Sequence, residues 1–187
     1  MLARKLDQIL VVDLECTCWK GSPPIGEIQE IIEVGLCVVN CDTLTRDVSK
    51  SFLVKPTESQ IGSFCTELTS LTPNDVLDGM DFAETCRTLR STYHGDNRLW
   101  GSWGDYDRRQ FERQCKRRGV KYPFGATHLN IKNLFAIAYG LPHEYGMDKA
   151  LQFVGIPLEG KHHRGVDDAT NIAKLLCHLL QKIRNTV

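Results

Sequence analysis

Residues 8–19 read QILVVDLECTCW, and they join an apolar run to two closely spaced acids. The apolar run from Gln8 to Val12 predicts a strand buried on both faces. Asp13 and Glu15 follow it, and residues two apart on a strand project from the same face. Two like charges at the end of a buried strand repel each other and are costly to desolvate, and a divalent cation would remove both penalties. The alternative is that the strand ends at Val12 and both carboxylates are solvated.

The rest of the chain predicts a mixed α/β sheet flanked by helices. Further strands are expected near residues 30–40, 48–56, 98–103 and 129–131, and helices near 82–93, 107–118, 134–139, 147–154 and 166–183. Helix-start chemistry appears at residues 72–75 (TPND), and Gly95 is expected to end the helix over 82–93. Short connections favour an antiparallel meander for the first three strands, and the alternating α and β units that follow favour parallel strands.

Length and composition fit one globular domain over residues 1–187, with 42% hydrophobic and 25% charged residues. The formal net charge of zero argues against a nucleic-acid coat protein, yet a nuclease needs only a local basic surface. No apolar run reaches the roughly 20 residues that span a bilayer, so no membrane partner and a cytoplasmic location are expected. The eight cysteines are scattered without a CxxC pair, which predicts buried free thiols.

The last predicted helix directs a carboxylate toward the sheet. Extending its apolar stripe backward by one turn reaches Asp168, whereas Asp167 lies about 100° around the helix, in line with polar residues. The alternative for both acids is a helix N-terminal charge favoured by the dipole. His163, in the loop before the helix, suits proton transfer because histidine titrates near neutral pH, although loop histidines are usually just solvated. The stripe consists of Ile172, Leu175, Leu176, Leu179 and Ile183.

A third acidic segment is Gly104-Asp105-Tyr106-Asp107. Asp107 shares helical spacing with Phe111 and Cys115, so it is expected to face the core. Asp107 is the preferred metal ligand and Asp105 the alternate, and either could instead cap the helix. Acids from three separate segments thus converge on one region of the sheet. Carboxylates suit Mg²⁺ or Mn²⁺, and two such ions about 3.5–4 Å apart can activate water and stabilise the leaving oxygen in phosphodiester hydrolysis.

Five segments together carry a resemblance to a known family. They are VVDLECTCW (11–19), EIIEVG (30–35), FCTELT (64–69), WGDYD (103–107) and HRGVDD (163–168). Over nearly its whole length the chain resembles the DEDDh 3′→5′ exonucleases, and among them the branch of histone-mRNA- and siRNA-degrading 3′-end exonucleases with its bacterial relatives. Segment 64–69 is expected ahead of a helix.

The resemblance implies a ribonuclease H-like fold and two Mg²⁺ or Mn²⁺ ions. Asp13 would bridge both ions, Glu15 and Asp168 would complete one site, and Asp107 would hold the other ion. His163 would be the general base. The implied reaction releases nucleoside 5′-monophosphates from a free 3′ end of single-stranded nucleic acid, with RNA as the expected substrate.

Substrate contacts are also implied. Residues 14–17 would meet the terminal sugar through the backbone at Leu14 and the hydroxyl of Thr17. Trp19 could stack on a base or pack in the core. Arg108 begins a basic run that either contacts phosphates or forms a solvated helix face. The run continues with Arg109, Arg113, Lys116, Arg117, Arg118 and Lys121.

Three alternatives stay open at this point. The chain could be a catalytically silent nucleic-acid- or protein-binding module, a DNA-directed exonuclease, or a scavenger of short oligonucleotides. The preference for RNA rests on the branch resemblance alone, since both polymers suit the same metal chemistry. The sequence predicts neither an oligomeric state nor a protein partner. No RNA-binding domain is recognised beside the nuclease, so modest selectivity among unstructured 3′ ends is expected.

Overall fold

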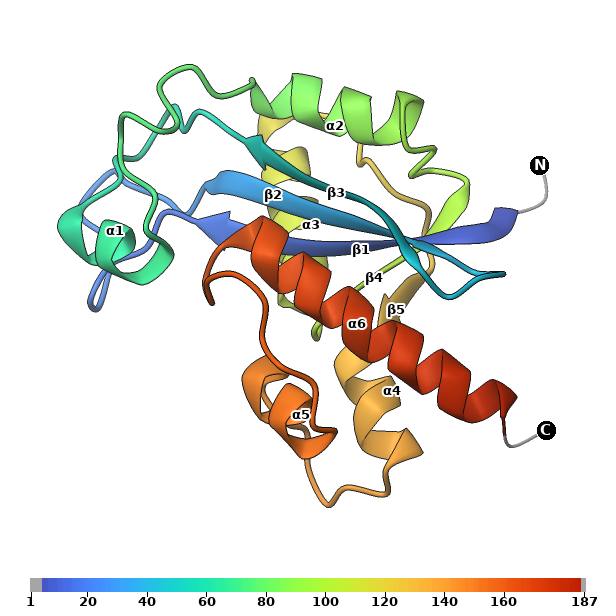
Figure 1. Cartoon of the computed structure of the whole chain (residues 1–187). Helices are drawn as coiled ribbons and strands as arrows, with labels where there is room; N and C mark the ends of the chain where they lie inside the picture. The colour runs from blue at the N-terminus through green and yellow to red at the C-terminus, as the bar shows by residue number, and fades with distance from the viewer. Residues whose placement is uncertain (1–4, 186–187) are drawn as a thin grey trace.

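A computed structural model describes residues 5–185, and these form a five-stranded sheet in the order β3-β2-β1-β4-β5 (Figure 1). The central strand β1 (Lys5–Cys16) pairs antiparallel with β2 (Ile31–Asn40), which pairs antiparallel with β3 (Arg46–Leu53). On its other edge β1 pairs parallel with β4 (Arg98–Ser102), and β4 with β5 (His128–Asn130). The predicted mixed sheet, antiparallel first and then parallel, is confirmed.

Helices cover both faces of the sheet. One face carries α6 (Gly165–Arg184) with α4 (Ile131–Ala138) and α5 (Met147–Phe153), and the other carries α2 (Phe82–Ser91) and α3 (Tyr106–Arg118), while α1 (Ser63–Thr69) lies at one end (Figure 1). Along β1, Ile9 and Val11 pack on the α6 side, whereas Leu10 and Val12 pack on the α2 and α3 side. Strand β1 is therefore buried on both faces, as its continuous apolar run predicts.

β1 does not end at Val12. It continues to Cys16, so Asp13 and Glu15 lie within the strand and follow Ile9 and Val11 on the α6 side. Glu15 is only 7% exposed and Asp13 is half-buried. The alternative in which both carboxylates are solvated after the strand is wrong.

Two local predictions differ from the structure. Residues 73–78 form turns instead of a helix, although the Asp75 carboxylate accepts hydrogen bonds from the backbone N–H and the hydroxyl of Thr72, each at 2.7 Å, as it would at a helix start. The helix in this part of the chain is α1. It occupies segment 64–69, which the resemblance predicts to lie ahead of a helix. Helix α2 ends at Ser91 and not at Gly95, since His94 takes the left-handed conformation, with φ of 56°.

A close backbone contact positions α6 on the sheet. Gly35 of β2 lies opposite Asp13 of β1, and a Cβ on Gly35 would lie 1.9 Å from the carbonyl carbon of Gly165. Only glycine allows the first turn of α6 to come this close to the strands. As a result, Asp168 in that turn lies beside Asp13.

The eight cysteines are free thiols, and most of them are buried, as predicted. Across residues 5–185, no helix is long and apolar enough to cross a membrane. A single exonuclease domain over residues 1–187 stays a prediction, and residues 1–4 and 186–187 lie outside the described range.

Candidate active site

The predicted acids and histidine line one pocket of about 290 Å³ beside the carboxyl end of β1. Asp13 and Glu15 come from β1, Asp107 from the first turn of α3, and Asp168 from the first turn of α6. His163 lies in the loop before α6. The structure therefore brings together residues that are up to 155 positions apart in the chain. The pocket is completed by Leu14, Trp103, Tyr106, Gly146, Met147, Asp148, His162 and Ile172.

Asp107 is tied directly to the central strand. The backbone N–H of Leu14 donates a hydrogen bond of 3.1 Å to its Oδ1, and the side chain is only 4% exposed. This contact fixes the start of α3 against β1, between the two carboxylates of the strand. The Asp107 side chain thus points inward, as its helical spacing predicts.

All four carboxylates have raised pKa values. Burial raises the pKa of Asp13 well above its ordinary value, and the neighbouring Asp107, Asp168 and Glu15 raise it further. Burial, followed by the charges of Asp168 and Glu33, raises the pKa of Glu15 to about 8. Burial also raises the pKa of Asp107 to about 6 and that of Asp168. Crowded acids that resist ionisation are a frequent mark of functional sites.

These residues fit a divalent cation. Carboxylate oxygens of Asp13, Glu15 and Asp168 lie within 4.8 Å of one another, close enough to share an ion. The donors are hard oxygens of like charge, which suit Mg²⁺ or Mn²⁺, and a bound cation would relieve the repulsion that helps raise the pKa values of Asp13 and Glu15. Asp107 lines the same pocket and adds a fourth carboxylate.

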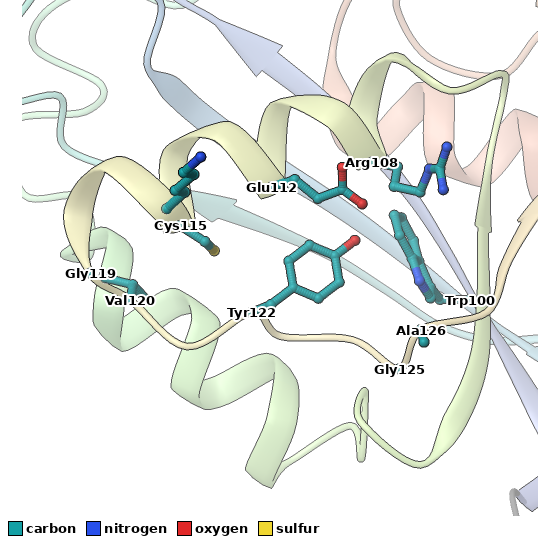
Figure 2. Close-up of a pocket in the computed structure, with 10 residues that line it drawn as sticks. Trp100, Arg108, Glu112, Cys115, Gly119, Val120, Tyr122, Gly125 and Ala126 are labelled. Atoms are coloured by element: carbon teal, nitrogen blue, oxygen red, sulfur yellow. The ribbon is translucent and has the colours of Figure 1, made fainter.

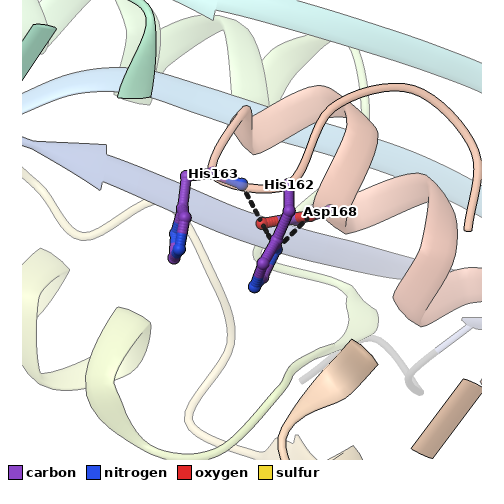
Figure 3. A group of neighbouring side chains, drawn as sticks. All are labelled: His162, His163 and Asp168. Carbon is purple, nitrogen blue, oxygen red and sulfur yellow. Dashed lines mark hydrogen bonds and ion pairs between the residues drawn. The ribbon is translucent and has the colours of Figure 1, made fainter. Parts of the chain in front are cut away.

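His163 has an unusual backbone conformation. Its φ of 66° is left-handed, which is uncommon for residues other than glycine, and its backbone N–H donates a 3.0 Å hydrogen bond to Oδ2 of Asp168. Its ring stacks on that of His162 with centroids 4.0 Å apart (Figure 3). Burial and the neighbouring His162 lower the pKa of His163, so its imidazole is neutral near pH 7. A strained residue of this kind at a cluster of acids is typical of functional sites.

Sequence reasoning missed His162 and Glu33. Nδ1 of His162 lies 3.0 Å from Oδ2 of Asp168, so this histidine pairs with a candidate ligand (Figure 3). Glu33 is fully buried behind the site, where its carboxylate accepts hydrogen bonds from Ser51, Arg164 and the N–H of Gly165. Glu33 was detectable as an acid inside the apolar run of β2, whereas the direction of His162 depends on the path of its loop.

Asp105 lies apart from this cluster. It precedes α3 as its N-cap residue, yet its side chain makes no capping hydrogen bond. Its Oδ1 lies 3.6 Å from Nη2 of Arg108 and 3.7 Å from Nδ1 of His128. Asp105 lines a neighbouring cavity of about 420 Å³ and not the pocket of the four acids. The geometry thus favours Asp107 over the alternate ligand.

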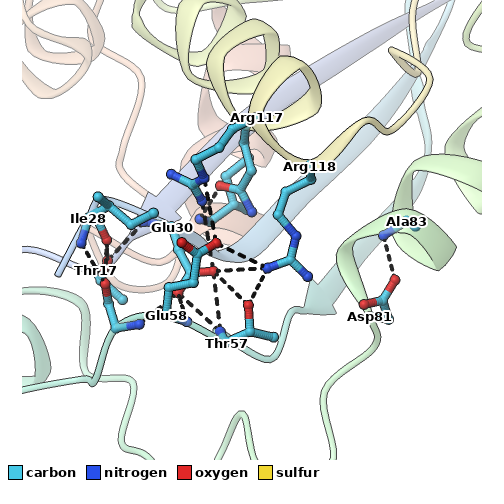
Figure 4. Close-up of polar contacts among 12 residues, drawn as sticks. Thr17, Ile28, Glu30, Thr57, Glu58, Asp81, Ala83, Arg117 and Arg118 are labelled. Atoms are coloured by element: carbon cyan, nitrogen blue, oxygen red, sulfur yellow. Dashed lines mark hydrogen bonds and ion pairs between the residues drawn. The ribbon is translucent and has the colours of Figure 1, made fainter. Parts of the chain in front are cut away.

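Of the predicted substrate residues Leu14, Thr17 and Trp19, only Leu14 lines the pocket of the four acids. Thr17 is fully buried, and its hydroxyl accepts from the N–H of Glu30 at 2.9 Å and donates to the carbonyl of Ile28 (Figure 4). The structure therefore gives this hydroxyl an internal role where the resemblance implied a sugar contact. Trp19 is half-buried and is not among the residues that line the pocket.

Arg108 lines a different cavity. That cavity, of about 580 Å³, lies between α3 and segment 119–126 and is also lined by Trp100, Glu112 and Tyr122 (Figure 2). The guanidinium faces this space and Asp105, so the structure does not bring Arg108 into the pocket of the acids.

Comparison with known proteins places these features in context. The family model for RNase T, described as an exonuclease, matches residues 10–176. The 3′-5′ exoribonuclease 1 of Homo sapiens is 29% identical over 94% of this chain and 53% of its own length. The 3′-5′ exonuclease Snipper of Drosophila melanogaster is 27% identical over 92% of this chain and 69% of its own length. The chain thus spans about half the length of the first of these curated relatives.

A solved structure shares the fold. The nuclease domain of 3′hExo, described as a DEDDh family member bound to rAMP, superposes with a TM-score of 0.86 at 27% identity. The superposition covers 94% of this chain and 92% of that domain. The ribonuclease H-like fold that the resemblance implied is confirmed.

Proposed function

Since this chain belongs to the RNase T-like family of DEDDh 3′→5′ exonucleases, we propose that it removes nucleotides stepwise from the 3′ end of single-stranded RNA and releases nucleoside 5′-monophosphates. One observation carries the proposal. Four carboxylates from three separate elements, with a histidine, line the same pocket. Such an arrangement is costly unless divalent cations occupy it, and paired divalent cations are what phosphodiester hydrolysis uses.

Two Mg²⁺ or Mn²⁺ ions are the proposed cofactors. Asp13, Glu15 and Asp168 would hold one of them, and Asp107 would hold the other together with Asp13. When bound, such ions lower the pKa of water and stabilise the oxygen that leaves the phosphorus. The chain's own contribution is to hold the four carboxylates in place. The Leu14 N–H orients Asp107, and the His163 N–H orients Asp168.

His163 is the proposed proton acceptor. No other residue within 5–185 takes a hydrogen bond from its ring, and its lowered pKa keeps the imidazole neutral. A neutral imidazole at the pocket wall can take the proton of an attacking water. His162 is already paired with Asp168, so it is better suited to orienting that carboxylate.

RNA is the proposed polymer, and support comes from relatives. The human relative is named an exoribonuclease, and the related nuclease domain was solved with a ribonucleotide, rAMP. A protein tells RNA from DNA through the ribose 2′-hydroxyl. The free thiols suit a reducing compartment, so we place the protein in the cytoplasm.

The test is a gel assay with 5′-labelled single-stranded RNA and DNA of the same sequence. Wild-type protein in Mg²⁺ should give a ladder that shortens from the 3′ end, faster on RNA than on DNA, and EDTA should abolish it. Equal rates on both polymers would contradict the RNA preference. No ladder on either polymer from folded protein would favour the binding module. Cleavage confined to the shortest oligonucleotides would favour the scavenger.

A further inference from the structure

The basic run on α3 divides into two halves with different surroundings. At the end of the helix, Arg117 and Arg118 are engaged by acids: Arg118 Nη1 lies 3.7 Å from Glu30 and 3.4 Å from Glu58, and Arg117 Nε lies 3.6 Å from Glu58 (Figure 4). Glu30 and Glu58 therefore already balance the charges of Arg117 and Arg118. We call these four residues, with Thr57 and Ser59, the Glu30 region.

Arg109 and Arg113, nearer the start of α3, are exposed and have no acidic partner. Within residues 5–185, no ion pair forms at Arg109, and Arg113 donates a hydrogen bond to the neutral amide oxygen of Gln110. The spacing from Tyr106 through Arg109 to Arg113 is i, i+3 and i+7, so the three side chains share one helix face. At ~1.5 Å rise per residue they cover about 10 Å along the helix.

This face begins at the active site. Tyr106 is 46% exposed, and it lines both the pocket of the four acids and the adjoining cavity of about 420 Å³. Arg109 and Arg113 line that second cavity. The two cavities therefore adjoin each other, with Trp103 and Tyr106 forming part of the wall of both.

The charges in the second cavity leave the two arginines uncompensated. Its acids are Asp105 and Glu144, and each has a basic partner: Arg108 lies 3.6 Å from Asp105, and Lys132 Nζ lies 3.2 Å from Glu144. The local surface is positive although the whole chain has a net charge of zero. A local positive groove is what a phosphate backbone requires.

We propose that Tyr106, Arg109 and Arg113 form a track for the nucleotides upstream of the one being cleaved. The occupant is a single strand of nucleic acid whose phosphates contact the two arginines, and one of whose bases stacks on Tyr106. Charge complementarity and the wall shared with the catalytic pocket select this occupant. The inference rests on the proposed function. The track would make the rate of the exonuclease depend on substrate length, which the catalytic residues alone do not do.

The experiment compares two double variants that remove equal charge. R109Q/R113Q removes both positive charges of the track. K116Q/K121Q removes two exposed lysine charges elsewhere, and Lys116 lines the separate cavity of Figure 2. Each is assayed on the p-nitrophenyl ester of thymidine 5′-monophosphate, on diuridylate and on octauridylate. Binding of fluorescent octauridylate in EDTA is measured over a range of salt concentrations.

R109Q/R113Q should lose about tenfold in octauridylate affinity and kcat/KM, and keep wild-type rates on the small ester. Its log–log salt slope should become shallower by about 1.4, since each lost single-strand phosphate contact contributes about 0.7. K116Q/K121Q should match wild type. An unchanged octauridylate affinity in R109Q/R113Q, or an equal loss in both variants, would overturn the track and leave this face to an acidic protein partner. If wild type hydrolyses neither the ester nor the oligonucleotides, it is the proposed function that fails.

Discussion

Two regions of this molecule bury carboxylates, and they treat them in opposite ways. Glu30 is 1% exposed, and its carboxylate accepts hydrogen bonds from the backbone N–H groups of Thr57, Glu58 and Ser59 and from the Thr57 hydroxyl. Two arginine side chains lie within 4 Å of the same carboxylate (Figure 4). The protein itself thus supplies the positive charge and the donors that a buried acid needs.

The pocket of four acids lacks such compensation. Asp107 accepts the backbone N–H of Leu14 and a hydrogen bond from the Ser102 side chain, and Asp168 accepts the N–H of His163 beside the His162 ring. Asp13 and Glu15 face other carboxylates. The same residue type is therefore structural in one region and left in need of a cation in the other. Burial alone does not separate the two regions, but the inventory of donors around each carboxylate does.

The largest expected effect is on catalysis. Asp13→Asn should reduce turnover by on the order of 10³-fold or more, about 4 kcal/mol of transition-state stabilisation, because it removes the carboxylate at the centre of the cation site. Glu30→Gln, assayed below its unfolding temperature, should retain turnover within about threefold. Single-turnover rates on 5′-labelled RNA measure both. If Glu30→Gln were as inactive as Asp13→Asn, Glu30 would not be a purely structural carboxylate, and the proposed difference between the two regions would be wrong.

The two acids at the start of α3 extend the comparison. Asp107→Asn should cost on the order of 10²-fold or more in kcat, because its carboxylate lines the pocket. Asp105→Asn should keep most activity, since Asp105 lies in the adjoining cavity beside Arg108. Rates of both variants on the small thymidine ester check this. The reverse pattern would show that the motif is misaligned by two positions.

Stability should move in opposite directions in the two regions. Glu30→Gln is expected to lose roughly 2–3 kcal/mol of unfolding free energy, because charge-assisted hydrogen bonds are weakened. Glu15→Gln in EDTA should gain about 1 kcal/mol, because it removes one of the mutually repelling charges. Urea unfolding at pH 8 measures both free energies. Destabilisation by Glu15→Gln of the same size as that by Glu30→Gln would contradict the account.

The smallest expected effect is a dependence of stability on pH. The pKa of Glu15 rises from 4.5 to about 8 on folding, so between these values the native state holds a proton that the unfolded chain releases. Stability from this group is full below about pH 4.5 and is lost as pH rises toward 8. In EDTA the unfolding free energy should therefore fall by about 1 kcal/mol or more across this window.

Glu15→Gln is the control for this pH effect, and it should flatten the profile. Added Mg²⁺ should restore stability at pH 8, because a ligand bound only by the native state stabilises it. A profile in EDTA that rises with pH, and rises equally in Glu15→Gln, would refute the predicted sign.

Much of the fold follows from patterns within single elements. The apolar run of β1 predicts its central place, and the stripe of α6 predicts the inward direction of Asp168. Residues 72–75 misled because Thr72 and Asp75 make the same local hydrogen bonds in a turn as at a helix start, and only the burial of Leu71 and Val76 decides between them.

The site shows a similar division. Strand and helix periodicity locate Asp13, Glu15, Asp107 and Asp168 in one pocket. Periodicity has no bearing on the contact of His162 with Asp168, which depends on a loop that passes through a left-handed residue, nor on the pairing of Thr17 with Glu30 across two segments. Contacts made by irregular backbone require the tertiary structure.

The central claim is that the pocket of four acids, unlike the Glu30 region, is completed by a divalent cation. Calorimetric titration of metal-free protein with Mn²⁺ at pH 8 and at pH 6 tests it most directly. Binding should be saturable and tighter at pH 8, because the carboxylates must lose their protons, and it should be abolished in Asp13→Asn and kept in Asp105→Asn. Absence of binding at pH 8, or equal binding by Asp13→Asn, would contradict it.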